Sequence, residues 1–301
     1  MIINFIPIIL FFIIFYIFSF YDLLELFENN KKTIVFSLTC HENIDCVIDL
    51  INNIYRCFED FNIYILISTN ETINSQIMKL DLDENIIIVT VRDDRHNIWA
   101  NIDLFYQHIK NIIYLKNNNI KYDYFWFIAS NEYFIKKINS NFLENNIIKN
   151  YTKKELSNDE VRNFYDNFLK NNQTWHWYKV IKLDNYTINI LKENNIILKY
   201  GRHESLVIPS HLALEIAEFY EKLKIQENSV YKKYPMEEIF IFSYLTSKYN
   251  LDKINTFCLI DDDIKIEDVY DKALINSSIV SIKPVKRNYN DSLRVRIRNS
   301  L

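Results

Sequence analysis

The sequence predicts an α/β fold in which a mostly parallel sheet carries helices on both faces and follows a transmembrane helix. Three observations lead to this prediction. Strand-like and helix-like segments alternate from residue 33 onward, an aromatic and branched stretch covers residues 124–129, and residues 2–21 form an uncharged apolar run. Alternating strands and helices favour a parallel sheet, because parallel strands need long crossover connections.

The first third of the chain reads as strand, helix, strand and strand. Residues 33–40, 62–68 and 85–91 are rich in the branched and aromatic side chains typical of strands. Residues 44–58 repeat apolar side chains at the spacing of a helix laid on a sheet. A unit of this kind predicts parallel strands joined by right-handed crossovers.

Residues 122–135 contain the expected central strand. The run at 124–129 suits a strand that is covered on both faces of a sheet. Ser130, Asn131 and Glu132 follow at its carboxyl end, which is where open α/β sheets bind their ligands. We therefore expect the functional site at this edge, although a buried strand with a capped turn would give the same pattern.

The rest of the chain supplies the other elements. A basic tail is expected after the last strand. The expected segments are a helix at 100–115, a polar helical and loop region at 139–170, strand and loop from 175, strands at 205–209, 256–260 and 279–282, and helices at 236–249 and at 210–226, the latter capped by Ser210.

Residues 2–21 are long enough to cross a bilayer and predict a single-pass membrane anchor. A cleaved signal peptide is the alternative, but a basic n-region and a small-x-small cleavage site are missing. Residues 22–32 then form a linker and residues 33–301 one domain. Several N-x-[ST] sequons favour a lumenal domain of the ER or Golgi type, whereas Lys31 and Lys32 argue against it by the positive-inside rule.

The composition excludes several classes of function. The chain contains one glycine, Gly201, so it has no P-loop, no GxGxxG dinucleotide turn and no GxSxG nucleophile elbow. A net charge of −4 gives no reason to expect nucleic acid, whose phosphates need a basic face. The four cysteines lack the spacing of a zinc site.

Five segments match, in order, the motifs of a known enzyme family. They are Ile34-Val-Phe-Ser-Leu-Thr-Cys-His-Glu42, Ile98-Trp99, Ala129-Ser-Asn-Glu-Tyr-Phe-Ile135, Glu237-Glu-Ile-Phe-Ile-Phe-Ser243, and Lys283-Pro-Val-Lys-Arg287 with Arg294. Residues 33–298 thus resemble the core-2/I-branching N-acetylglucosaminyltransferases, glycosyltransferase family 14, and their distant bacterial and viral relatives. The family's W-G and L-S-G-x-D-x-P-I motifs each lose their glycine here.

The resemblance implies a GT-A-like, Rossmann-like fold and an inverting transfer of a sugar from a UDP-sugar to an acceptor hydroxyl. The sugar would be of the GlcNAc, xylose or glucose type, and the acceptor a glycan or glycoprotein. It also implies transfer without a metal-bound DxD motif. No metal and no cofactor is therefore expected beside the donor substrate.

The resemblance points to Glu238 as the catalytic base, because it aligns with the glutamate at the family's helix start. An inverting transfer needs one carboxylate to deprotonate the attacking hydroxyl. Adjacent Glu237 should point about 100° away on the helix, so we expect only one of the pair to face the site. Two acidic residues that complement a helix dipole would look the same in sequence.

Basic residues near the C-terminus are the candidates for neutralising the departing diphosphate. Lys283, Arg287 and Arg294 could do so, since ammonium and guanidinium groups bind phosphate oxygens. A solvated basic tail is the alternative. His41 and Glu42, at the end of the first strand, are further candidates for binding the donor.

The candidate acceptor-binding residues lie in three segments. Ser130, Asn131 and Glu132 end the central strand, Trp99 lies in the second matched motif, and Glu204 precedes the strand expected at 205–209. Glu204, like His41 and Glu42, could equally be a capping or surface residue.

Two other functions fit the same sequence. One is a catalytically inactive, membrane-anchored carbohydrate-binding or interaction protein on the same scaffold. The other is a metal-dependent transferase in which Asp261-Asp-Asp263 holds Mg²⁺ or Mn²⁺, although this acidic run comes late in the chain for a GT-A metal motif.

Overall fold

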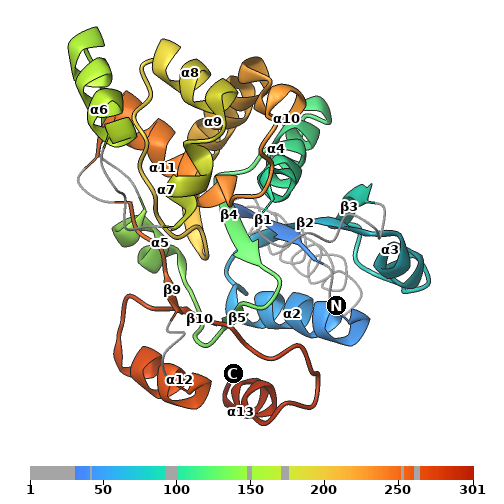
Figure 1. Ribbon diagram of the computed structural model, residues 1–301. Coiled ribbons are helices and arrows are strands. Elements are labelled where there is room, and N and C mark those ends of the chain that lie inside the picture. Colours follow the sequence, from blue (N-terminus) through green and yellow to red (C-terminus); the bar gives the residue numbers. More distant parts are fainter. Residues whose placement is uncertain are drawn as a thin grey trace, which may run out of the picture.

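The structure is a computed structural model, and it describes most of the chain from residue 31 onward (Figure 1). The predicted membrane segment and the candidates His41, Glu42, Trp99 and Asp261–Asp263 lie outside the described residues. Among the described helices, none combines the length and the apolar character needed to cross a membrane. The described ranges are 31–40, 43–92, 101–147, 151–170, 176–251, 254–260 and 265–301.

A five-stranded sheet forms the centre of the fold, with strand order β3-β2-β1-β4-β7. The first four strands along the chain pair in parallel, and β7 pairs antiparallel with β4. The predicted mostly parallel sheet is therefore confirmed. The bounds are β1 Thr33–Thr39, β2 Asn62–Asn70, β3 Ile86–Arg92, β4 Tyr124–Ala129 and β7 Leu206–Pro209.

Helices cover both faces of this sheet, as the sequence predicts (Figure 1). Successive strand residues point to opposite faces, so each strand contributes to two separate cores. In β4, Phe125 and Phe127 pack with α4 Ile102–Asn117, α9 Ser210–Leu223 and α11 Met236–Lys248. Trp126 and Ile128 belong to the opposite core, which α2 Ile44–Cys57 covers.

Aromatic rings fill the core between β4 and α2. The Trp126 ring is stacked on Phe36 with centroids 5.6 Å apart, and it meets Phe58 edge-on at 5.0 Å. Phe134 contacts Trp126 edge-on at 5.6 Å. Such pairs add roughly 0.5–1.5 kcal/mol beyond the burial of their area. They fix the end of β4 and the turn that follows it.

Two small sheets bring distant segments beside the central sheet. In the first, β10 Ser281–Lys283 pairs antiparallel with β5 Tyr133–Phe134 and parallel with β9 Cys258–Ile260. The second joins β6 Tyr151–Lys153 to β8 Tyr249–Leu251. The first of these sheets places the basic C-terminal segment next to the turn after β4.

Three local predictions are wrong. Residues from 176 form a helix, α7 His176–Ile181, rather than strand and loop. Ser210 is the first helical residue of α9, and the N-cap is Pro209, which has no side-chain cap bond. The expected basic tail contains a helix, α13 Ser292–Ser300, capped by Asp291.

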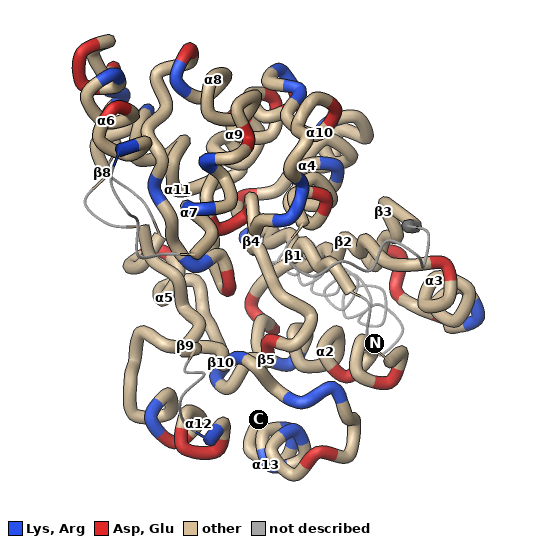
Figure 2. Tube along the Cα trace, viewed as in Figure 1, with Lys and Arg blue, Asp and Glu red and all other residues tan. Residues whose placement is uncertain are grey.

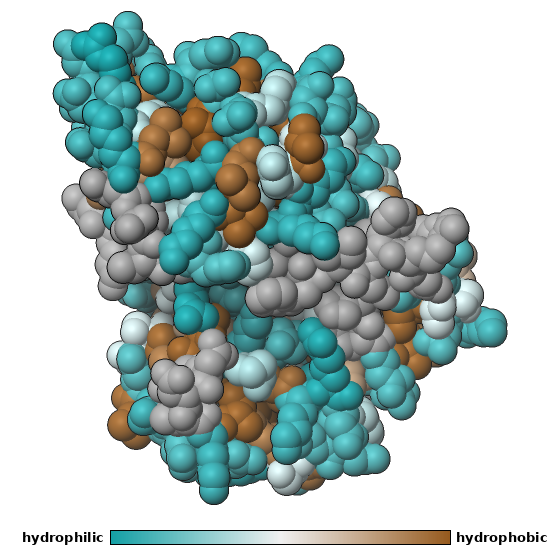
Figure 3. All heavy atoms as spheres, in the orientation of Figure 1, coloured by the Kyte–Doolittle hydropathy of each residue, from teal (hydrophilic) through white to brown (hydrophobic). Residues whose placement is uncertain are grey.

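Several further helices complete the described fold. The visible face is mostly hydrophilic, with small apolar patches between (Figure 3), as expected when most large apolar side chains lie in the two cores. The remaining helices are α3 Glu71–Ile77, α5 Ser140–Asn146, α6 Asn158–Lys170, α8 Asn185–Glu193, α10 Ile225–Asn228 and α12 Ile266–Ile275.

A buried ion pair attaches α13 to α2. Basic positions lie along α13 (Figure 2), and Arg294 among them is fully buried. Its Nη1 donates to Asp49 Oδ2 at 2.8 Å, while Arg298 Nη1 donates to Asp49 Oδ1 at 2.9 Å. The guanidinium of Arg294 also lies 4.9 Å from the ring centre of Tyr133. One carboxylate of α2 thus compensates two cations of the C-terminal helix.

Asp49→Asn should therefore destabilise the fold strongly. Removing the charge leaves the Arg294 guanidinium buried without its counter-ion, a change that typically costs about 3–5 kcal/mol. Urea unfolding followed by tryptophan fluorescence measures this loss. Asp271→Asn is the matched control, since its pair with Arg296 is about half exposed and should contribute about 0–1 kcal/mol. Equal losses in the two variants would contradict this account of α13.

Candidate active site

A pocket of about 170 Å³ lies at the carboxyl ends of β1 and β4. Its floor includes the strand ends Thr39 and Ala129, and its walls come from the start of α11, the loop before β7 and the end of β10. Six of the residues predicted from the sequence line it together: Ser130, Asn131, Glu204, Glu238, Lys283 and Arg287. The predicted location of the site is thus where the structure has a pocket.

Another cavity, of about 460 Å³, lies between α2 and α13. Its deepest carboxylate, Asp49, is already bonded to two arginines. In the smaller pocket, His203 Nδ1, Glu204 Oε2 and Glu237 Oε2 are buried without a hydrogen-bond partner among the described residues, whereas in the larger cavity this holds for the Tyr133 hydroxyl. We therefore take the smaller pocket as the candidate site.

Both glutamates at the start of α11 line the pocket, so the expectation that Glu237 points away from the site is wrong. The pocket wraps around the end of the helix, and side chains about 100° apart reach the same space. Burial raises the pKa of Glu237 to about 8. Burial, together with the charge of Glu204, raises the pKa of Glu238 to about 7.

The loop before β7 is held against α11 by the one glycine of the chain. The backbone N–H of Gly201 donates to the carbonyl of Glu238 at 2.9 Å. A Cβ at residue 201 would lie 2.4 Å from the Phe242 ring, which is closer than any real contact. Glycine is needed here for close approach, and this approach sets His203 and Glu204 opposite Glu238.

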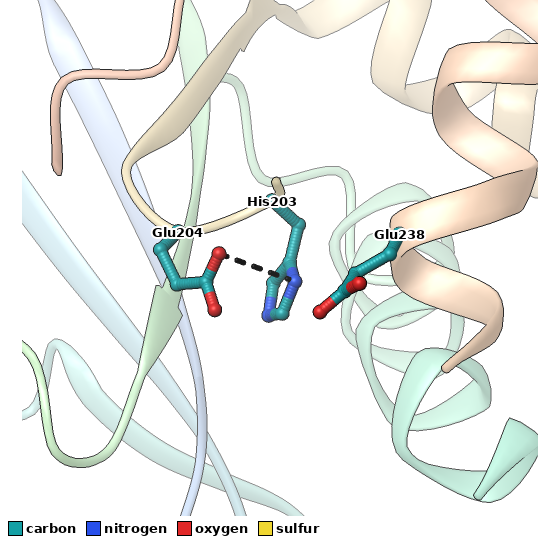
Figure 4. Close-up of side chains that lie close together, drawn as sticks. All are labelled: His203, Glu204 and Glu238. Carbon is teal, nitrogen blue, oxygen red and sulfur yellow. Dashed lines mark ion pairs between the residues drawn. The ribbon is translucent and has the colours of Figure 1, made fainter. Parts of the chain in front are cut away.

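His203, Glu204 and Glu238 form a cluster in which the imidazole lies between the two carboxylates (Figure 4). His203 Nδ1 is 3.8 Å from Glu204 Oε2. Burial lowers the pKa of His203 to about 4, so the ring is neutral at pH 7. The other oxygen of Glu204 accepts a hydrogen bond from Lys283 Nζ at 2.5 Å.

The Glu204–Lys283 pair keeps both partners charged. Burial opposes ionisation of Glu204, but the nearby His203 and Lys283 outweigh it and hold the pKa of this carboxyl below its usual range. Burial likewise opposes the charge on Lys283, and Glu204 outweighs it and raises the pKa of the ammonium. The pocket therefore contains a fixed ammonium group whose direction is set by a carboxylate.

The same cluster could hold a metal ion. One ligand atom each from His203, Glu204 and Glu238 lies within 4.8 Å of the others. His203 Nδ1 and Glu204 Oε2 are buried and have no hydrogen-bond partner among the described residues. A nitrogen and two carboxylate oxygens suit Mn²⁺ or Zn²⁺. Against this, Lys283 already provides a positive charge at Glu204.

Two predicted site residues do not reach the pocket. Glu132 is fully buried beneath it, where Ser205 and Ser281 donate hydrogen bonds to its carboxylate, so it cannot contact an acceptor directly. Burial raises the pKa of Glu132 to about 7. Arg294 is fully buried in its ion pair with Asp49, and it is not placed to contact a diphosphate.

Sequence reasoning missed several pocket residues. His203 adjoins the predicted Glu204, and this neighbouring pair of titratable side chains was a signal that could have been followed. His108 reaches the pocket from α4. Its Nδ1 is hydrogen-bonded to Ser37 Oγ at 2.7 Å. Trp177 reaches it from α7, the segment whose structure was predicted wrongly.

The fold and the pocket together define an α/β protein with a carboxylate-rich site at the carboxyl edge of a mostly parallel sheet. No protein-family model matches the chain, and no curated protein matches it either.

Several solved structures resemble the chain, and three of them are glycosyltransferase structures. The mannosyltransferase Ktr4p from S. cerevisiae is 13% identical over 75% of this chain and 67% of its own, with a TM-score of 0.31. The structure of Ktr4p in complex with GDP is 11% identical over 72% of this chain and 67% of its own, with a TM-score of 0.30. The bifunctional glycosyltransferase WbbM gives 12% over 90% of this chain and a TM-score of 0.39, and the chain spans about half (51%) of it. Because these TM-scores are below 0.5, we assign the fold from the strand order of the central sheet and not from these similarities.

Glu237→Gln should stabilise the folded chain at high pH only. The pKa of Glu237 is raised, so the stability contributed by its bound proton is present below pH 4.5 and lost as the pH rises through about 8. Glutamine has no proton to lose, and its advantage should reach on the order of 2–4 kcal/mol by pH 9. Urea unfolding at pH 5 and pH 9 tests this.

Glu193→Gln is the control for that comparison, because Glu193 is an exposed residue at the end of α8. It should change the free energy of unfolding equally little at both pH values. A Glu237→Gln variant that gains nothing between pH 5 and pH 9 would mean that Glu237 ionises without penalty in the folded chain.

Proposed function

We propose that the chain is an inverting glycosyltransferase that moves a sugar from a UDP-sugar to an acceptor hydroxyl. The observation that carries the proposal is a single pocket that combines buried carboxylates at the start of α11 with the basic side chains of Lys283 and Arg287. Inverting transfer requires both kinds of group around one anomeric carbon, a base for the acceptor and positive charge for the diphosphate.

Glu238 is the proposed base. A general base works best when its pKa lies near the working pH, and burial raises the pKa of Glu238 to about 7. Glu238 is only partly buried, whereas Glu237 is buried, so Glu238 is the more accessible of the two to an acceptor. Its ionised carboxylate would take the hydroxyl proton while the acceptor oxygen bonds to the anomeric carbon.

Lys283 and Arg287 would stabilise the leaving group. As the bond between the anomeric carbon and the donor phosphate oxygen breaks, the diphosphate gains negative charge. An ammonium already oriented by Glu204 costs little reorganisation at that moment. The resemblance to glycosyltransferase family 14 supports UDP as the nucleotide, a donor sugar of the GlcNAc, xylose or glucose type, and a glycan or glycoprotein acceptor.

A metal-dependent transferase is the second candidate function. The unpartnered His203 Nδ1 and Glu204 Oε2 favour it, because a divalent cation would satisfy both atoms. The cation would add positive charge beside the diphosphate. In that case Glu238 would bind the metal and could not act as the base, so the two candidates make different predictions.

Glu238→Gln should lower sugar transfer by about 10²- to 10⁴-fold, because glutamine keeps the size of the side chain but cannot accept the proton. The affinity for UDP should change little. Steady-state transfer from radiolabelled UDP-sugars, together with calorimetric UDP binding, measures both quantities. Full transfer activity in this variant would remove Glu238 as the base.

Glu237→Gln is informative in the same assay. If it abolishes transfer while Glu238→Gln does not, the neighbouring carboxylate is the base. A wild-type chain that binds UDP but transfers no sugar to any acceptor would favour the inactive carbohydrate-binding alternative.

UDP should bind in the presence of EDTA, and Lys283→Ala and Arg287→Ala should each weaken binding. Loss of a charge-assisted phosphate contact costs on the order of 1.5–3 kcal/mol, or about 10- to 100-fold in affinity. Isothermal titration calorimetry measures this directly. Lys286→Ala is the control, since its side chain is exposed and bonds only loosely to Asp291 at 3.4 Å. Binding that appears only after Mn²⁺ is added, and is lost in His203→Ala, would establish the metal-dependent candidate instead.

A further inference from the structure

Glu132 holds together the segments that carry the Glu204–Lys283 pair. Its side chain is fully buried directly after β4. Its Oε1 accepts hydrogen bonds from Ser281 Oγ at 2.6 Å and from Ser205 Oγ. Its Oε2 accepts from the Ala129 N–H at 3.3 Å, and the two serine hydroxyls lie 2.8 Å apart. One carboxylate therefore joins three segments that are far apart in sequence.

The two serines are close neighbours of the two paired residues. Ser205 directly follows Glu204 in the loop before β7. Ser281 lies two residues before Lys283 in β10, and residues two apart in a strand point to the same side. A movement of either serine would therefore move the carboxylate or the ammonium group of the pair.

The backbone at Ser205 needs this support. Its φ is +48°, in the left-handed region that costs energy for a residue with a Cβ. Such a conformation persists only where the surroundings fix it. Besides the Glu132 contact, the Ser205 carbonyl accepts from the Phe257 N–H at 3.2 Å, and the Phe257 carbonyl accepts from the Ser281 N–H at 3.2 Å. Ser205 and Ser281 are thus linked through both side chains and backbone.

We propose that Glu132 is a positioning residue that sets the geometry of the Glu204–Lys283 pair and thereby the direction in which the Lys283 ammonium meets the donor diphosphate. The proposal rests on the proposed function for its effect on UDP. Glu132 acts from beneath the pocket and needs no contact with the substrate.

Two variants separate positioning from simple loss of packing. Glu132→Ala removes all three hydrogen bonds, whereas Glu132→Gln keeps a carbonyl oxygen that can accept from both serines. Each is made in the full-length wild-type chain and again in the Lys283→Ala background. If Glu132 acts through Lys283, its effect on UDP binding must disappear when Lys283 is absent.

Calorimetric UDP binding is the first readout. We expect Glu132→Ala to weaken binding about 10-fold in the wild-type background and not at all in Lys283→Ala, while Glu132→Gln stays within about 3-fold of wild type. An equal loss in both backgrounds, or no loss in a folded Glu132→Ala chain, would overturn the proposal. If Glu132→Ala does not fold, Ser281→Ala replaces it in the same cycle with the same expectations.

The second readout does not depend on UDP. In a chain labelled with ¹⁵N-lysine, the partly buried Lys283 ammonium, held by Glu204, should give an NMR signal protected from exchange with water, identified by its absence in Lys283→Ala. Glu132→Ala should remove the protection and Glu132→Gln should keep it. A signal unchanged in Glu132→Ala would overturn the proposal. If the NMR signal behaves as expected in both variants but the wild-type chain binds no UDP, the proposed function is refuted and the positioning role of Glu132 remains supported.

Discussion

A sheet that is covered on both faces leaves few places for polar side chains, and the rest of the structure depends on this constraint. In β1, the buried Ser37 hydroxyl is hydrogen-bonded to His108 and Asn111. Burying an unbonded polar group costs free energy, so polar side chains are better accommodated where the strands end. The parallel direction of β1 and β4 brings two such ends to one edge, and the pocket lies there.

Several polar atoms of the pocket are buried and have no hydrogen-bond partner among the described residues. Glu237 is buried and the adjacent Glu238 is partly buried, and burial together with neighbouring carboxylates raises the pKa of both. Glu204 forms an ion pair with the ammonium group of Lys283. Strongly shifted pKa values of carboxyl groups in a pocket are typical of functional sites.

The sequence was sufficient for β1 to β4 and α2, because runs such as Ile63 to Ile67 contain no competing signal. It also located the pocket, because polar residues follow the central strand at the edge where open α/β sheets bind their ligands. It could not locate α13, whose mean hydropathy is low and whose buried Arg294 makes sense only with Asp49, 245 residues earlier. Glu132 was misassigned for the same reason, because nothing local reveals that its partners are Ser205 and Ser281.

The one glycine of the chain has an unusual purpose. Residues in the left-handed region are Asn119, Asn195, Ser205 and Lys224, so among the described residues backbone freedom is supplied without glycine. Gly201 is instead kept for its small volume beside Phe242. A side chain at residue 201 would fit only if the residue at 242 became smaller at the same time. The two sites are therefore expected to covary among relatives of this chain, with a side chain at 201 accompanied by a smaller residue at 242.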